Sequence, residues 1–232
     1  MPYLWGFTDA VHGAILQQRH MDIVANNLAN VNTAGFKADR LIFNDIMTRQ
    51  IMVDYRQGSF KVTNNPLDVA IEGQGFFQVR TKDGIRLTRN GNFSMLGDGR
   101  LVTMQGYPVL SAGGSPITLN PNGPRVHIDE KGGIYQGDNK LAELGIVDVD
   151  DRTTLEKVGN NLFAGIKGKN PKVRPARDYG VSQGVLEMSN VEVVSQMVGM
   201  ITAHRSFESY MKAIHAMEEI DTKAATQVGR VA

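Results

Sequence analysis

The segment that divides this sequence is ANNLANVNTAGFK, residues 25–37. Upstream of it, apolar residues recur with the spacing of an α-helix, and within it that periodicity stops. Gly35 lies where a helix ending here would place a left-handed residue, a conformation that glycine adopts without a steric penalty. We therefore expect one helix over residues 3 to about 31, followed by a positive φ angle at Gly35.

The upstream helix is expected to be amphipathic. Its apolar positions alternate spacings of four and three residues, which is typical of helices that pack along one another. The seam consists of Phe7, Val11, Ala14, Gln18, Met21, Ala25 and Leu28. These few apolar side chains cannot offset the entropy lost when a helix of this length is ordered by itself, so the helix needs a partner.

A second amphipathic helix is expected from about residue 189 to residue 228, with Ser189 or Asn190 as its N-cap. Its seam consists of Val193, Met197, Met200, His204, Phe207, Met211 and Ile214, and a neighbouring row of Val194, Ile201, Tyr210 and Met217 widens the apolar face. The two helices are predicted to pair as a coiled coil. Because the C-terminal face is wider than one partner covers, part of it is expected to form an interface with other chains.

The pattern alone leaves two arrangements of these ends open. In one, both helices are poorly ordered in the lone chain and become fully ordered on assembly. In the other, they form an intramolecular hairpin that covers one face of the middle domain, because amphipathic helices commonly pack on their own core.

The middle of the chain has a different pattern. Glycines are frequent, and short alternating runs are bounded by turn pairs such as Asp83-Gly84 and Gly132-Gly133. The candidate strands are residues 68–71, 76–80, 86–89, 101–103, 107–110, 126–128, 134–136 and 144–149. The expected fold class is therefore α+β, with a central all-β domain of short antiparallel strands flanked by the two terminal helices.

Four segments are predicted along the chain. Residues 1–35 form an N-terminal assembly helix, 36–65 a linker or extended segment, 66–180 the β-rich domain, and 181–232 a linker followed by the C-terminal assembly helix. Residues 39–55 fit either a helix or an extended chain, and residues 57–65 fit a loop or an edge strand.

Composition excludes several functional classes. The 232 residues carry a net charge of +1 with scattered lysines and arginines, so no surface for nucleic acid or an anionic membrane is indicated. The absence of cysteine excludes disulfides and zinc–thiolate sites, and it suits a protein exported unfolded. The first 25 residues show no basic start followed by an apolar run, and nowhere do 18 uncharged apolar residues run together. Neither a cleaved secretory signal nor a membrane span is therefore expected.

No pattern for catalysis, metal binding or cofactor binding is present. The five histidines lack metal-ligand spacing. The acidic run of Asp148, Asp150 and Asp151 lacks the glycine and distal glutamate of a calcium loop, so it is expected to be a solvated strand end. The glycines around Gln74 precede a strand-like run instead of a helix, which argues against a dinucleotide loop. We expect a protein that is not an enzyme and has no cofactor.

Several segments resemble the flagellar axial proteins, the family of rod and hook subunits. Residues 25–37 are similar to the N-terminal signature of that family, and residues 66–77 (PLDVAIEGQGFF) to the start of its β-domain. The resemblance continues through residues 88–93 (TRNGNF) and 99–103 (GRLVT), and residues 186–191 (LEMSNV) precede the terminal helix as in these proteins. It covers nearly the whole chain.

This resemblance implies a structural role. Such proteins are exported through the flagellar type III apparatus without a cleaved signal, and they assemble helically with the terminal helices inside and the β-domains outside. The implied partners are copies of the chain and other axial proteins, and the implied location is the basal-body rod, the drive shaft across the periplasm. Within the family, the chain resembles proximal rod proteins in its short length and in residues 205–208 and 211–212. A distal rod or hook-type protein is the alternative.

The predicted assembly interface combines the two seams with polar residues around the end of the first helix, where asparagine amides can supply donors and acceptors. It consists of Phe7, Val11, Ala14, Gln18, Met21, Ala25, Asn26, Asn27, Leu28, Asn30, Asn32, Gly35, Val193, Met197, Met200, Ile201, His204, Phe207, Met211 and Ile214. Two alternatives belong to other classes: a secreted enzyme or glycan binder with helical dimerisation arms, and an adaptor whose β-domain binds one partner.

Overall fold

The computed structural model describes residues 3–43 and 49–228, which form two compact units. The helical unit comprises Met1–Asn30, Asp39–Met52 and Val191–Ala232, and the β-unit comprises Val31–Ala38 and Val53–Asn190. Each unit is therefore built from segments that are far apart in the sequence.

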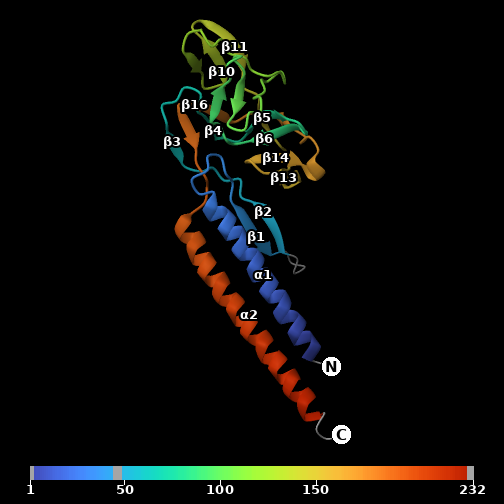
Figure 1. Cartoon of the computed structure of the whole chain (residues 1–232). Coiled ribbons are helices and arrows are strands. Elements are labelled where there is room, and N and C mark those ends of the chain that lie inside the picture. The colour runs from blue at the N-terminus through green and yellow to red at the C-terminus, as the bar shows by residue number, and fades with distance from the viewer. Residues whose placement is uncertain (1–2, 44–48, 229–232) are drawn as a thin grey trace. The chain divides into compact units, whose positions relative to one another are not determined.

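The helical unit contains α1 (Tyr3–Ala29) and α2 (Val193–Val228), which lie side by side in Figure 1. It also contains a pair of strands, β1 (Asp39–Phe43) and β2 (Arg49–Val53). Of the two conformations that fitted residues 39–55, the extended one is therefore observed at both strands, whereas residues 44–48 lie outside the described part of the chain.

The two helices run antiparallel in a regular register. A Cβ atom built on Gly6 would lie 3.6 Å from Cε of Met217, and one built on Gly199 would lie 3.8 Å from Cγ2 of Val24. A constant register of this kind lets the apolar stripe of each helix pack against the other. The prediction that the terminal helices pair with each other is confirmed.

The ends of the helices agree only in part with the sequence prediction. Gly35 has φ +68°, so the predicted left-handed glycine after α1 is confirmed. The predicted N-cap of α2 is wrong, because the helix begins at Val193 and the carbonyl of Glu192 accepts a hydrogen bond of 3.0 Å from the N–H of Gln196. The side chain of Asn190 instead binds backbone within the β-unit.

The β-unit consists of short strands and two 3-10 turns, η1 (Arg152–Thr154) and η2 (Ile166–Gly168). The strands are β3 (Phe60–Val62), β4 (Val69–Gly73), β5 (Phe76–Thr81), β6 (Gly84–Thr88), β7 (Phe93–Met95), β8 (Leu101–Thr103), β9 (Val126–Ile128), β10 (Gly133–Gln136), β11 (Asn139–Glu143), β12 (Ile146–Asp148), β13 (Leu155–Lys157), β14 (Leu162–Gly165), β15 (Arg174–Pro175), β16 (Tyr179–Gln183) and β17 (Val185–Glu187).

The largest sheet of the β-unit has the order β13-β14-β6-β5-β12-β15, and β11-β10-β9 forms a second sheet. The remaining strands pair as β16-β4, β17-β3 and β7-β8, and the pairings are antiparallel as predicted. Strands 101–103 and 126–128 have their predicted bounds. The predicted strand at residues 107–110 is not a continuous strand, because this segment pairs through isolated bridges such as Val79↔Val109 and Val102↔Pro108.

Two core clusters lie on opposite faces of β5. Successive side chains of a strand point to opposite faces, so the adjacent Phe76 and Phe77 enter different clusters. The ring of Phe77 meets Phe93 edge-on at 5.1 Å between centroids, and the ring of Phe76 meets Phe163 at 5.6 Å. Because both faces of β5 are buried at its start, Phe76 and Phe77 are both apolar and do not alternate with polar residues.

Candidate assembly surface

The two helices are joined by a small apolar cluster. Ala10 and Ala14 of α1 are buried with Ile214 of α2, and partly buried side chains pack around them. These are Val11, Phe207, Tyr210 and Met211. Because alanine permits close approach of the backbones, the aromatic and methionine side chains of α2 cover α1 directly.

Only part of the predicted α1 seam faces α2. Ala14 is buried, and Val11, Met21 and Leu28 are partly buried. Phe7, Gln18 and Ala25 are exposed. The row that is buried instead includes Ala10 and Val24, one position away from the predicted seam. The exposed seam residues are therefore available for contacts with other chains.

The predicted α2 seam divides in a similar way. Ile214 is buried, and Met200, Phe207 and Met211 are partly buried, so these positions are engaged within the helical unit. Val193, Met197, Ile201 and His204 are exposed. Ala203, which the predicted seam omitted, is buried with an exposure of 1%.

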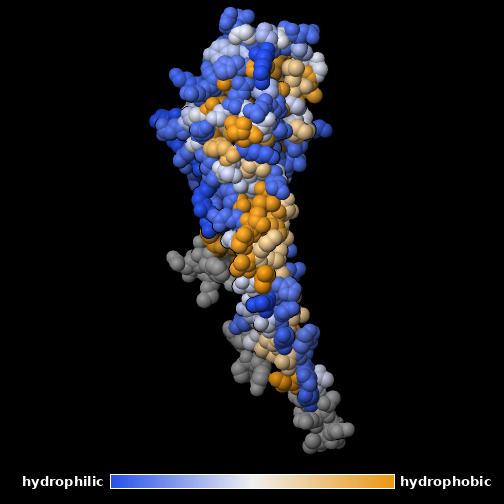
Figure 2. Space-filling model, turned by 90° about the vertical axis from the view of Figure 1, so that its left-hand side faces the viewer, coloured by the Kyte–Doolittle hydropathy of each residue, from blue (hydrophilic) through white to orange (hydrophobic). Residues whose placement is uncertain are grey.

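An apolar stripe remains uncovered on the first turns of α2. Val194 is 75% exposed, Met197 49%, Val198 58% and Ile201 54%. From Val193 to Ala203 the helix has no charged residue. Figure 2 shows hydrophobic side chains gathered on the face that includes this helix. Burying such a side chain fully is worth roughly 1.5–3 kcal/mol, so the stripe is a candidate contact surface.

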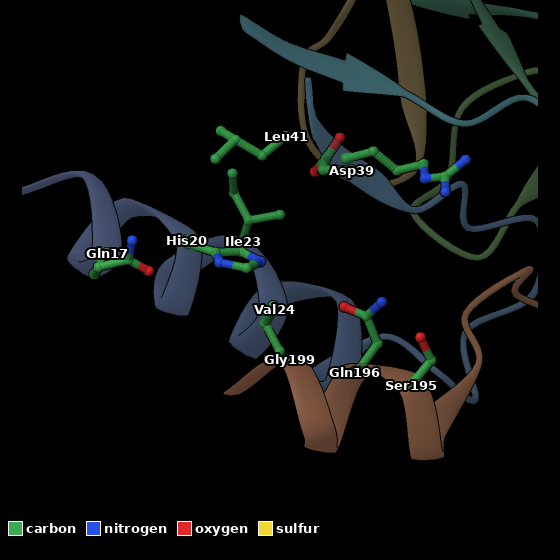
Figure 3. A pocket seen from close by; sticks show the side chains of 10 residues that line it. Gln17, His20, Ile23, Val24, Asp39, Leu41, Ser195, Gln196 and Gly199 are labelled. Atoms are coloured by element: carbon green, nitrogen blue, oxygen red, sulfur yellow. The ribbon is translucent and has the colours of Figure 1, made fainter. Parts of the chain in front are cut away.

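A groove lies elsewhere in the helical unit, between α1, β1 and α2. It has a volume of about 300 Å³, and Ile23 and Val24 of α1 and Leu41 of β1 form its apolar walls. Figure 3 shows Ile23 and Leu41 reaching toward one another across it. Ser195 and Gly199 line the groove on α2, and their small size keeps it open.

Asn27 holds the end of α1 to β1. Its Nδ2 donates to the carbonyl of Asp39 at 2.8 Å and to Oε1 of Gln196 at 3.1 Å, and its Oδ1 accepts from the N–H of Asp39 at 2.9 Å. The amide thus satisfies both polar groups of one strand residue and contacts α2 as well. Of the predicted interface asparagines, Asn27 is buried, whereas Asn26 and Asn32 are exposed.

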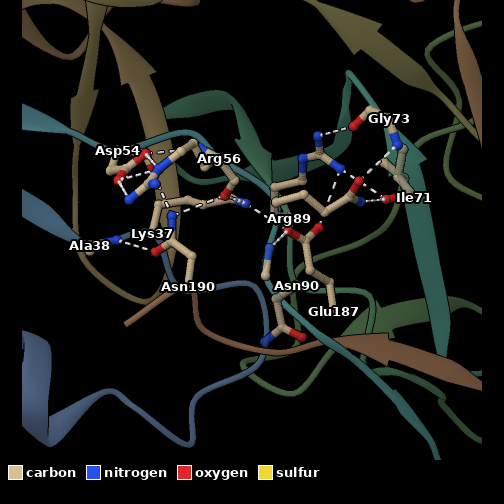
Figure 4. A network of polar contacts seen from close by, with 12 residues as sticks. Lys37, Ala38, Asp54, Arg56, Ile71, Gly73, Arg89, Asn90, Glu187 and Asn190 are labelled. Atoms are coloured by element: carbon tan, nitrogen blue, oxygen red, sulfur yellow. Dashed lines mark hydrogen bonds and ion pairs between the residues drawn. The ribbon is translucent and has the colours of Figure 1, made fainter. Parts of the chain in front are cut away.

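A buried ionic network lies in the β-unit, as Figure 4 shows. The Nζ atom of Lys37 lies 2.6 Å from Oε1 of Glu187, and Nη1 of Arg89 lies 3.3 Å from Oε2 of the same carboxylate. Glu187 also accepts from the N–H of Gly58 at 3.0 Å, and Lys37 donates to the carbonyl of Arg56 at 2.7 Å. Both carboxylate oxygens are therefore paired, as a buried charge requires.

The chain enters and leaves the β-unit beside this network. The N–H of Gly35 donates to the carbonyl of Glu187 at 2.8 Å. The N–H of Ala38 donates to Oδ1 of Asn190 at 2.8 Å, and Nδ2 of Asn190 donates to the carbonyls of Asp54 and Arg56. Three separate segments are therefore fixed to one another at this point.

The network shifts the pKa values of its cations. Burial lowers the pKa of Lys37, and the adjacent carboxylate of Glu187 opposes that shift. Burial also lowers the pKa of Arg89, again opposed by Glu187. Because burial alone disfavours the charges, the network depends on each partner for its stability.

The acidic run at the end of β12 is only in part the solvated strand end that the sequence predicted, because Asp150 and Asp151 are exposed whereas Asp148 is not. Asp148 is buried, with Nη2 of Arg152 3.1 Å from its Oδ1 and Nη2 of Arg174 3.3 Å from its Oδ2. Burial alone would raise the pKa of Asp148, but a backbone hydrogen bond from Val149 and these arginines hold it below its ordinary value. Asp151 instead accepts from the N–H of Thr153 at the start of η1.

The sequence reasoning assigned no role to Lys37, Arg89 or Glu187, although all three lie in segments that resemble the axial family. The signal that could have found them is a charged residue inside an otherwise apolar or glycine-rich segment. If such a residue is buried, it needs a partner. Their partnership was not visible, since Lys37 and Glu187 are 150 residues apart.

The described residues give little support for metal binding or for a membrane-spanning role. In the described part of the chain, no group of three or more histidine, cysteine or acidic side chains could hold a metal ion. His204 and His215 lie near Glu208 and Glu218 on the exposed face of α2, at 3.6 and 3.3 Å. Among the described helices, none combines the length and apolar character needed to cross a membrane.

The terminal helices pair with each other and leave an apolar stripe uncovered, and the chain between them forms the β-unit. These features define a subunit of a larger assembly. Residues 10–37 match the family described as flagella basal body rod protein. Residues 70–136 match the flagellar hook protein FlgE/F/G D1 domain, and residues 182–227 the flagellar basal body rod FlgEFG protein C-terminal region.

Relatives match over nearly the full length. The flagellar basal-body rod protein FlgF of Caulobacter vibrioides is 34% identical over 231 residues, which cover 92% of this chain and 94% of the relative. FlgF of Mesorhizobium japonicum is 34% identical, with 86% and 88% covered, and the rod protein FlgG of Bacillus subtilis is 32% identical, with 88% and 91% covered. The chain belongs to the flagellar basal-body rod protein family. It is a structural, non-enzymatic subunit of the axial rod.

Proposed function

We propose that the chain is a FlgF-type subunit of the proximal rod and that it polymerises through the exposed faces of α1 and α2. The observation that carries this proposal is the uncovered stripe of Val194, Met197, Val198 and Ile201, which leaves apolar area in water unless another subunit covers it. The relatives named FlgF at 34% identity support the proximal assignment.

The assembly interface follows from the placement of the predicted residues. Those that are exposed and apolar, such as Phe7, Val193, Met197 and Ile201, contact neighbouring subunits. Those that are buried, such as Ala14 and Ile214, hold the helical pair together and act indirectly. Neighbours are copies of this chain and other axial rod or hook proteins.

The β-unit supplies stiffness under this proposal. A rod that transmits torque from the motor to the hook must resist twisting within each subunit. The network of Lys37, Arg89 and Glu187 fixes the segments through which the chain enters and leaves the β-unit. A packed, buried site in which one carboxylate binds two cations resists deformation more than a loop does.

The proposed location is the periplasmic part of the basal body, reached through the flagellar type III export apparatus without a cleaved signal. A chain without cysteine passes through such an apparatus unfolded with no risk of mispaired disulfides. The segments expected to serve assembly are residues 1–35 and 181–232, and residues 66–180 form the β-rich part between them.

Gene deletion followed by imaging of isolated basal bodies tests this function. We expect cells without the gene to lack a complete rod and to be non-motile, with the rod interrupted near its motor-proximal end. Complementation by the full chain should restore both, whereas a chain without residues 1–35 and 190–232 should not. Complete rods in the deletion strain would refute the function.

The same images decide between the two rod positions. An interruption near the hook would favour a distal rod subunit, an alternative supported by the FlgG relative at 32% identity. An enzyme or glycan binder with helical arms would keep its activity in the truncated chain, which separates that class from a rod subunit.

A further inference from the structure

We propose that the apolar stripe of α2 in one copy of this chain docks into the groove between α1, β1 and α2 of the next copy. The stripe consists of Val194, Met197, Val198 and Ile201, and the groove walls are formed by Ile23, Val24 and Leu41. The inference rests on the proposed function, in which the helices are the polymerising elements, and it names the contact and its occupant.

The first argument is the angular position of the two surfaces on α2. A helix turns by about 100° per residue, so Ser195, Gln196 and Gly199, which line the groove, share one face. By the same rule the stripe is centred about 160° away, on the opposite face of α2. One copy therefore cannot place its own stripe in its own groove.

The second argument concerns what such an arrangement builds. A contact between two different surfaces of the same chain is heterologous, and it continues indefinitely unless the rotation happens to close a ring. Each added copy presents a new stripe and a new groove on opposite faces of α2. A stripe that packed against an identical stripe would instead stop at a dimer, which does not suit a subunit of a rod.

The third argument is the chemistry of the two surfaces. The stripe lies in an uncharged part of α2, from Val193 to Ala203, and needs an apolar partner. The groove has a volume of about 300 Å³, and its lining combines Ile23, Val24 and Leu41 with polar side chains such as Gln17, His20 and Arg40. The apolar part of this lining offers Ile23, Val24 and Leu41 to the protruding valine, methionine and isoleucine side chains of the stripe.

The chain contains no cysteine, so disulfide trapping can test this contact without background from native thiols. Val198→Cys marks the stripe and Leu41→Cys marks the groove, and a disulfide requires Cα atoms within about 7 Å. After oxidation of the two purified variants mixed together, we expect a covalent dimer that contains one of each. The double variant should give a ladder of covalent multimers, both as purified protein and in isolated basal bodies.

A matched control is Val62→Cys in β3, whose native valine is 67% exposed but lies in the β-unit. Paired with Leu41→Cys, it should give no dimer above the level of unpaired variants. Circular dichroism should show unchanged helix content for each variant, because the altered side chains are exposed or partly exposed.

Two results would overturn the inference. Dimers formed only between two copies of Val198→Cys would show a stripe-to-stripe contact. An absence of cross-links in both purified protein and basal bodies would show that something other than this groove covers the stripe. Immunoblotting of the basal bodies separates these results from failure of the proposed function, since a rod subunit is present there whether or not it forms this contact.

Discussion

The Nζ atom of Lys37 lies 2.6 Å from Oε1 of Glu187, and both side chains are buried in the β-unit although 150 residues separate them. The first residue is among those through which the chain enters this unit, and the second is among the last before it leaves. The contact therefore ties the short segment Val31–Ala38 to the end of the long segment Val53–Asn190. Arg89 supplies the second cation.

Removing the shared carboxylate should have the largest effect on this network. Glu187→Gln leaves Lys37 and Arg89 buried without an anion, so the free energy of unfolding should fall by about 3–5 kcal/mol. Lys37→Met should lower the free energy of unfolding by a smaller amount, because Arg89 still pairs with Glu187. Urea unfolding followed by fluorescence or circular dichroism measures both.

The ion pair of Arg100 with Asp98 provides the control, since it is 2.6 Å long but exposed on both sides. Arg100→Ala should change stability within the error of the measurement, because exposed pairs contribute little. An equal loss from Arg100→Ala and Glu187→Gln would contradict the assigned importance of burial.

Gly35→Ala should destabilise the β-unit strongly. Its φ of +68° disfavours any side chain, and a Cβ atom there would lie 2.3 Å from the backbone nitrogen of Asn90. Gly106 has a similar φ of +82° but open space around it. Gly106→Ala should therefore cost about 1 kcal/mol from backbone strain, and Gly35→Ala roughly 1–3 kcal/mol more from overlap. Similar midpoints in urea for the two variants would show that the close approach does not exist.

Asn27→Ala should weaken the attachment of α1 to β1. The substitution leaves the N–H and the carbonyl of Asp39 without their amide partner, at a cost of about 1–3 kcal/mol. Asn32→Ala, at an exposed position five residues later, should change stability by less than about 0.5 kcal/mol. Thermal unfolding followed by helix content compares the two, and a reversed order would argue against the role of Asn27.

Acid should destabilise the β-unit in part through Asp148. Its folded pKa lies below the unfolded value of 3.8, so its contribution to stability is present above pH 3.8 and is lost as the pH falls through the folded pKa. Asp148→Asn removes this group, so stability should fall less steeply with pH below 3.8. Urea midpoints across this range test the sign, and a steeper fall in the variant would contradict it.

The terminal helices could be predicted because their information is local. The spacing of apolar residues and the position of Gly35 are read directly from neighbouring residues. The row of α1 that faces α2 was predicted incorrectly in part, because Ala10 packs through a small side chain that carries little hydrophobic signal. The buried row consequently lies one position from the predicted seam.

The contacts that close the β-unit could not be predicted for a different reason. β16 (Tyr179–Gln183) pairs with β4, and its own residues alternate too weakly to identify a strand. The same holds for Lys37 and Glu187, whose charges indicate the need for a partner but not which one. The exposed stripe was anticipated as a wide apolar face, whereas the groove depends on β1, which the sequence left undecided.

The most direct test of assembly through the α2 stripe compares two valine substitutions in the cell. Val198→Asp alters the stripe, and Val62→Asp alters a valine of similar exposure in the β-unit. Electron microscopy of isolated hook-basal bodies should show that Val198→Asp abolishes complete rods while Val62→Asp retains them, with both purified variants folded. Complete rods at the normal frequency with Val198→Asp would contradict assembly through this surface.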